Sequence, residues 1–140
     1  MIDNCNELFG DKSDLVHTTS LLRYPVFKNG EPYNGKPNMT TNFLLRKYLL
    51  NYFVNEASML QDAIFIGLGP TVSDALTWLV SQNAINENKV LSGILHPSGN
   101  NTYRVKYLTG SRKEAVPHAT NPVPYDSGKA HFKRKFLKVV

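Results

Sequence analysis

The stretch AIFIGLG at residues 63–69, followed directly by PTVSDALTWLVSQ at residues 70–82, decides the fold. The first stretch is apolar on both faces, which is typical of a strand buried in a parallel sheet. Its glycines indicate a tight turn. The second stretch offers Thr71 or Ser73 as a cap and then repeats apolar residues at helical spacing, so it predicts a helix over 71–82. A buried strand that leads through a turn into a helix is a building unit of α/β proteins.

The same alternation continues on both sides of this unit. Residue types and turn signals predict, in chain order, a strand at 15–24, a turn-rich loop at 28–38 with two Asn-Gly pairs, a helix capped by Thr40 or Thr41, a strand at 90–96 and a helix at 101–109. The order strand, helix, strand, helix, strand, helix predicts an α/β three-layer sandwich with a short, mostly parallel sheet.

Length and composition limit the possible classes of protein. A chain of 140 residues with 41% hydrophobic residues forms one domain with a real core. We expect this core at 15–115 and a basic tail at 116–140. Cys5 is the single cysteine, so neither an internal disulfide nor a thiolate metal cluster is expected. We expect no cofactor and no metal. Residues 1–20 contain no apolar leader and no apolar run is long enough to span a bilayer, which predicts a cytoplasmic protein without membrane contact.

The charge is concentrated at one end of the chain. Residues 1–100 contain 7 Lys and Arg against 9 Asp and Glu, a net of −2, whereas residues 101–140 contain 9 against 2, a net of +7. This asymmetry points to a polyanionic partner, most often nucleic acid. The alternative is a solvated tail that keeps the protein soluble. Phe132 and Phe136 lie four residues apart among lysines, which predicts an amphipathic helix over 129–140.

Three loops leave the carboxyl ends of the predicted strands, at 25–38, 67–71 and 96–101. Ligands of open α/β sheets bind beside these ends, so the loops should lie together and form the site. In the GLGPT turn at 67–71, glycines and the free N–H groups of a helix start favour an anion. The motif is weak, and a plain strand-to-helix turn explains it about as well.

The HPSGNN loop at 96–101 is the more specific signal. His96 stands at the end of a strand, and a small polar loop follows it. The candidate ligand-binding residues of this loop and the next helix are Ser98, Asn100, Asn101, Arg104 and Lys106, the last two as phosphate contacts. His17, His118 and His131 have no comparable surroundings, and we assign them no role.

Three segments together resemble the uracil-DNA glycosylase superfamily, and its bacterial HPSG-type branch in particular. They are TSLLRYP (19–25), AIFIGLGPTVSDAL (63–76) and LSGILHPSGNNTYR (91–104). The resemblance covers roughly residues 8–115. It implies a glycosylase-like α/β fold and DNA as the partner, because members of this family flip a base out of duplex DNA and hydrolyse its N-glycosidic bond.

The resemblance also implies roles for individual residues. His96 would stabilise the charge of the departing base from a dry pocket, and Ser20, with Ser98, would contact the base. The loop from Ser98 to Asn101 would enter the stack that the base leaves. The backbone amides of Gly67 and Gly69, with the side chains of Arg104 and Lys106, would bind phosphates.

Two departures from the family pattern shape the functional hypotheses. Ser20 stands where the family reads uracil with an amide. The family's first motif, which positions the attacking water, and the strand before it have no counterpart. We therefore expect the strand at 15–24 to pair directly with that at 63–68, or a second copy or partner chain to fill the gap. The candidate functions are a base-excising enzyme, a non-catalytic nucleic-acid-binding protein, and a fragment that binds a partner through a sheet edge.

Overall fold

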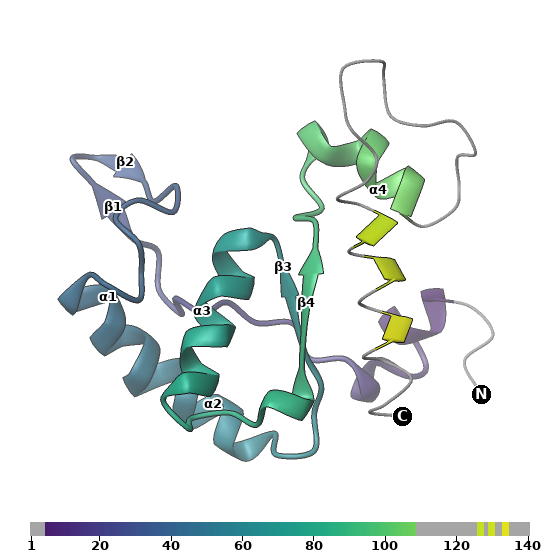
Figure 1. Cartoon of the computed structure of the whole chain (residues 1–140), viewed down its shortest axis with the longest axis horizontal. Coiled ribbons are helices and arrows are strands. Elements are labelled where there is room, and N and C mark those ends of the chain that lie inside the picture. Colours follow the sequence, from purple (N-terminus) through teal and green to yellow (C-terminus); the bar gives the residue numbers. More distant parts are fainter. Residues whose placement is uncertain (1–4, 109–125, 128, 131–132, 135–140) are drawn as a thin grey trace.

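The computed structural model describes residues 5–108, 126–127, 129–130 and 133–134 (Figure 1). These residues form a small α/β structure. The helices and strands, in chain order, are the 3₁₀ turns η1 (Cys5–Phe9) and η2 (Ser13–Leu15), β1 (Phe27–Lys28), β2 (Glu31–Pro32), α1 (Phe43–Tyr48), the π-helical turn η3 (Leu49–Phe53), α2 (Val54–Met59), β3 (Phe65–Leu68), α3 (Pro70–Ser81), the 3₁₀ turn η4 (Glu87–Lys89), β4 (Val90–Ile94), the 3₁₀ turn η5 (Gly99–Asn101) and α4 (Thr102–Leu108).

The strand–turn–helix unit predicted from 63–82 is confirmed, but its predicted cap is wrong. The helix begins at Pro70 after Gly69 and has no side-chain cap, so neither Thr71 nor Ser73 caps it. β3 leads into α3 and pairs in parallel with β4, with Phe65 opposite Val90 and Leu68 opposite Ile94. The strand predicted at 90–96 and the helix predicted at 101–109 are also present, as β4 and α4. Helices α1, α2 and α3 gather on one side of the two strands (Figure 1).

The strand predicted at 15–24 is wrong. This segment begins in η2, has no ladder pairing and bends at residues 21, 22 and 24. Its apolar residues do not alternate toward one face, since Leu21 is buried whereas Leu15 is 61% exposed. A hydrogen bond of 2.6 Å between His17 and Glu56 attaches the segment to α2. The expected direct pairing with 63–68 is therefore absent, and β3 pairs with β4 alone among the described residues.

The loop predicted at 28–38 begins with a hairpin. β1 and β2 pair in antiparallel through the first of the two Asn-Gly pairs. Asn29 and Gly30 have φ angles of 53° and 83°, the positive values that a tight hairpin turn of this kind needs. The two-residue strands were too short to show any alternation in the sequence.

The helix predicted after Thr40 or Thr41 is present, but its cap is a different residue. The side chain of Asn42 accepts a hydrogen bond from the backbone N–H of Leu45 at 3.1 Å. From α1 through η3 to α2, every fourth residue turns inward. The buried stripe consists of Leu45, Leu49, Phe53 and Ala57.

One face of the parallel pair is covered by α3. Leu76 and Leu79 of this helix are buried at 2% and 0% exposure. A Cβ atom at Gly67 would lie 3.0 Å from Ser73 Oγ and 3.1 Å from Leu76 Cδ1, so the glycine allows the helix to approach the strand. Ile66 and Leu68, which alternate with Gly67 along the strand, remain 46% and 41% exposed.

Parts of the tail lie outside the described residues, including Phe132 and Phe136 of the predicted amphipathic helix and the stretch 116–125. Lys129, Lys133 and the other described tail residues are helical and exposed. Within the described ranges, none of the helices combines the length and the apolar character that a bilayer crossing requires.

Candidate functional site

The three loops that we expected to form the site, at 25–38, 67–71 and 96–101, lie next to one another. A Cβ atom at Gly69 would be 3.1 Å from the Cβ of His96, which joins the turns at 67–71 and 96–101. A Cβ atom at Gly35 would be 3.5 Å from Thr71 Oγ1, which joins the loop at 25–38 to the same helix start. The parallel pairing of β3 and β4 explains this arrangement, because it brings the ends of both strands to one side of the sheet.

The glycines of the 67–71 turn have a different role from the one expected. The N–H of Gly69 donates to the carbonyl of Ile94 at 2.8 Å, and its own carbonyl accepts from the N–H of Ser73 at 3.0 Å. Gly67 is buried inside β3 against α3. The Gly69 amide is thus already bonded, and the buried Gly67 is not placed to meet a phosphate. Neither observation supports the expectation that these amides bind an anion, and both glycines allow close packing.

A bulge in β4 sets the direction in which the chain leaves the sheet. Ile66 lies opposite Leu91 and Leu68 opposite Ile94, so β4 carries one residue more than β3 between these pairs. Gly93 accommodates the irregularity with a φ of 90°. Bulges of this kind re-aim the side chains that follow them and are frequent beside active sites.

His96 follows this bulge and is exposed. In the absence of DNA the His96 side chain therefore does not lie in a dry pocket. An exposed imidazole is accessible to a large ligand such as DNA. It lacks the low-dielectric surroundings in which a hydrogen-bond donor stabilises developing charge most strongly.

A hydrogen-bonded network ties the HPSG turn to α4. The side-chain Nδ2 of Asn101 donates to the carbonyl of His96 at 2.9 Å and to Ser98 Oγ at 3.2 Å. Its Oδ1 accepts from Arg104 Nη1 at 2.7 Å. The backbone N–H of Ser98 also donates to the His96 carbonyl, at 2.9 Å. His96, Ser98, Asn101 and Arg104 are thus brought together, as the sequence led us to expect, and we call this group with Gly69 the rim.

The other predicted site residues have a looser relation to the rim. Lys106 is exposed on α4. Asn100 lies in η5, and its side chain is outside the described part of the structure. Ser20 is exposed on the unpaired segment before Leu21, and no hydrogen bond in the described part of the chain joins it to the rim. The base-reading role that the resemblance implies for Ser20 has no geometric support here.

Two titratable groups outside the predicted site have shifted pKa values. The hydrogen bond from His17 holds the pKa of Glu56 below its ordinary value of 4.5. Burial opposes this effect, and smaller contributions from Thr19 and from the charges of His17 and Arg23 act with the His17 bond. A hydrogen bond of 2.7 Å to Asp126 raises the pKa of Tyr107 and attaches the tail to α4. Sequence reasoning assigned His17 no role, because its partner is 39 residues away.

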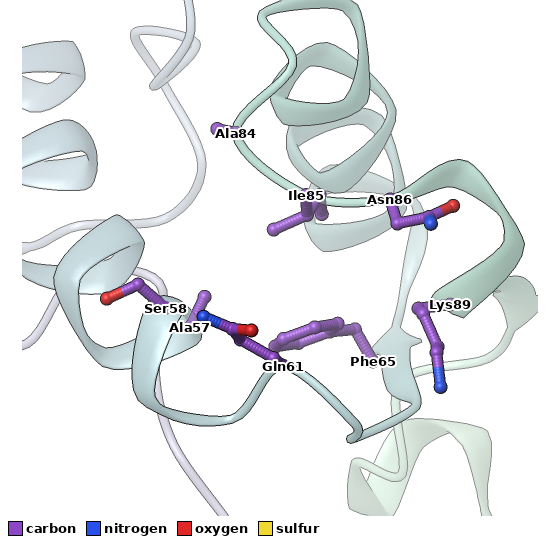
Figure 2. A pocket seen from close by; sticks show the side chains of 8 residues that line it. All are labelled: Ala57, Ser58, Gln61, Phe65, Ala84, Ile85, Asn86 and Lys89. Carbon is purple, nitrogen blue, oxygen red and sulfur yellow. The ribbon is translucent and has the colours of Figure 1, made fainter.

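A pocket of about 270 Å³ lies at the end of the parallel strands opposite the rim, where β3 and β4 begin (Figure 2). Ser58 lines it from the last turn of α2 and Gln61 from the turn that follows this helix, and Ile85 and Asn86 face them from the loop after α3. Phe65, the first residue of β3, forms part of its apolar wall. The pocket is separate from the rim. Among the described residues no group of three or more His, Cys, Asp and Glu is placed to hold a metal ion.

The chain is similar to a bacterial protein of unknown role. It is 31% identical over 115 residues to the uncharacterized protein YoxB of Bacillus subtilis (strain 168). The matched region covers 81% of this chain and 45% of YoxB, so the chain spans a little under half the length of this relative. No family model matches the chain, and no solved structure matches it significantly.

Proposed function

We propose that this chain is a DNA-binding protein of the uracil-DNA glycosylase type, which contacts DNA through the rim. The observation that carries the proposal is the direct apposition of Gly69 and His96, with the guanidinium of Arg104 linked to the same turn through Asn101. The segment from residue 96 to 108 contains no acidic residue, and residues 101–140 have a net charge of +7. A cationic rim at the ends of parallel strands suits the phosphate backbone.

In this proposal DNA binding comes before base excision. His96 is exposed and so lacks the low-dielectric surroundings that would most strongly support departure of a base. We therefore give DNA binding the first place in the proposal. The resemblance to the glycosylases supports a second part of the proposal, which is N-glycosidic cleavage with His96 stabilising the departing base.

The DNA-binding proposal is tested by the salt dependence of affinity for duplex oligonucleotides of several sequences. Wild-type protein should bind all of them, with an affinity that falls steeply as salt rises. Arg104→Ala should weaken binding uniformly across sequences and reduce the salt slope by about 1. Arg46→Ala, on α1 away from the rim, is the matched control and should change little. Equal affinities for the wild type and Arg104→Ala would exclude the rim as the DNA-binding surface.

The enzymatic part of the proposal needs a separate assay. Wild-type protein and His96→Ala are incubated with uracil-containing single-stranded and double-stranded DNA, and abasic sites are measured. Cleavage by the wild type that is abolished in His96→Ala supports base excision. If the wild type leaves the DNA intact while binding it, the chain acts as a binding protein.

A second candidate function is recruitment of another strand at the free edge of β3. Parallel sheets are normally covered on both faces and paired at central strands. Here β3 pairs with β4 alone among the described residues, and Ile66 and Leu68 are 46% and 41% exposed. Such an edge is a template for an added strand, which a second copy of this chain or a partner chain would supply.

Analytical ultracentrifugation over a range of concentrations tests the case of a second copy. A dimer that the double substitution Ile66→Lys with Leu68→Lys disrupts would support strand recruitment. Met59→Lys, at a side chain that is 81% exposed on α2, is the matched control and should leave the dimer intact. A monomer at every concentration would exclude self-pairing through this edge.

A further inference from the structure

We propose that Asn101 is a positioning residue, which fixes the HPSG turn and aims Arg104 at an anionic group without contacting that group itself. This inference rests on the proposed DNA-binding function and assigns a specific task within the rim. It replaces the expectation from sequence that Asn101 contacts the DNA directly.

The hydrogen bonds of Asn101 show why it is not free to bind a ligand as a donor. Its Nδ2 already donates to the His96 carbonyl at 2.9 Å and to Ser98 Oγ at 3.2 Å. An amide nitrogen has two hydrogens, so both are used. The partners also fix the orientation of the amide, because a guanidinium only donates and a backbone carbonyl only accepts.

The position of Asn101 in the sequence explains how one side chain reaches both ends of the turn. Asn101 is the last residue of η5, immediately before α4. Its amide reaches back five residues to His96 and forward three residues, about one helical turn, to Arg104. The histidine at the strand end and the helical cation are therefore held in one fixed relation.

The neutrality of Asn101 is the essential feature. Arg104 is half-buried, and its Nη1 donates to Asn101 Oδ1 at 2.7 Å. A guanidinium has five N–H donors, so this bond leaves others to form the fork that matches a phosphate. A carboxylate in the place of Asn101 would hold the guanidinium just as well, but it would cancel the charge that attracts the phosphate. An amide orients the cation and leaves its charge intact.

A double-mutant cycle on DNA binding tests whether Asn101 acts through Arg104. The full-length wild type, Asn101→Ala, Arg104→Ala and the double variant are titrated with a duplex oligonucleotide. Asn101→Ala should lower affinity roughly tenfold, the size expected when a charged hydrogen bond is removed. The double variant should bind no more weakly than Arg104→Ala alone. Additive effects of the two substitutions would show that Asn101 binds DNA by itself and would overturn the proposal.

Two further variants separate charge from folding. Asn101→Asp should lower affinity more than Asn101→Ala and reduce the salt slope by about 1, because the carboxylate neutralises Arg104. Asn42→Ala removes the capping amide of α1 and serves as the matched structural control. It should leave DNA affinity unchanged. An Asn101→Asp protein with wild-type affinity and slope would contradict the role assigned to neutrality.

A measurement on the free protein keeps this inference distinguishable from the proposed function. In NMR spectra without DNA, Asn101→Ala should shift the side-chain N–H signals of Arg104 and the ring signals of His96. If the wild type fails to bind DNA but these shifts occur, the DNA-binding function fails and the positioning role stands. If the Arg104 signals are the same in both proteins, the positioning role is overturned whatever the DNA result.

Discussion

Gly69 is the residue on which the close approach of two turns depends. It has a φ of 97°, and a Cβ atom there would approach the Cβ of His96 to 3.1 Å. The positive φ disfavours a side chain at this position through backbone strain, and the short distance to His96 disfavours it through atomic overlap. Both features arise because the end of β4 lies against the turn that begins α3.

We predict that Gly69→Ala destabilises the protein and displaces His96. The positive φ costs about 1–3 kcal/mol for a residue other than glycine, and the overlap with His96 adds to this cost. Urea unfolding measures the stability, and the NMR signals of the His96 ring report its displacement. Gly30→Ala is a matched control, since Gly30 has a φ of 83° but no atom within 4 Å of an added Cβ. Equal destabilisation in both variants, with unchanged His96 signals, would contradict the close approach.

The pair of His17 and Glu56 predicts a dependence of stability on pH. Because the folded state lowers the pKa of Glu56, the pair stabilises the protein above the unfolded value of about 4.5, and this contribution disappears as pH falls through the folded value. The effect is at most about 1 kcal/mol, since His17 is 55% exposed. A carboxyl NMR titration should show the pKa of Glu56 rising toward its ordinary value in His17→Ala. An unchanged titration curve would show that the hydrogen bond is not formed in solution.

At the scale of elements, the parts that sequence predicts well are those with strong local signals. The strand and helix at 63–82 combine an apolar run, a Gly-rich turn and helical spacing, and all three signals agree. The segment 15–24 has the residue types of a strand but no partner strand among the described residues, so its β propensity is not realised. It is attached to α2 through the hydrogen bond between His17 and Glu56. The placement of Asn101 between His96 and Arg104 depends on the 3₁₀ turn at 99–101, which carries no clear sequence signature.

The start of α1 provides a prediction about capping. Asn42→Ala should destabilise the protein by about 0.5–2 kcal/mol, because it removes the side-chain acceptor of the Leu45 N–H. Thr41→Ala is the comparison, because Thr41 is exposed and its hydroxyl donates to Asn38 rather than capping the helix. It should change stability by less than about 0.5 kcal/mol. Thermal unfolding of both variants checks the order, and a larger destabilisation in Thr41→Ala would restore the cap expected from sequence.

At the scale of the whole molecule, the uneven charge is the property on which the proposed DNA binding depends most. The described tail residues Lys129 and Lys133 are exposed, and Asp126 binds Tyr107 of α4, the helix that also carries Arg104. Part of the described tail, at Asp126, therefore lies against the helix that carries Arg104. If the basic tail extends the DNA-binding surface, its lysines release counterions when they meet phosphates, whereas lysines of a merely solubilising tail release none.

We therefore predict that Lys129→Gln with Lys133→Gln reduces the slope of log affinity against log salt by up to about 1.8, at about 0.9 for each phosphate that the variant no longer neutralises. The control is Arg46→Gln with Lys47→Gln on α1, which removes the same net charge from a region away from the rim. Because both variants change the total charge equally, a general electrostatic attraction would affect them equally. A slope that falls only in the tail variant supports direct binding of phosphates by the tail, and equal slopes in the two variants would assign the tail to solubility alone.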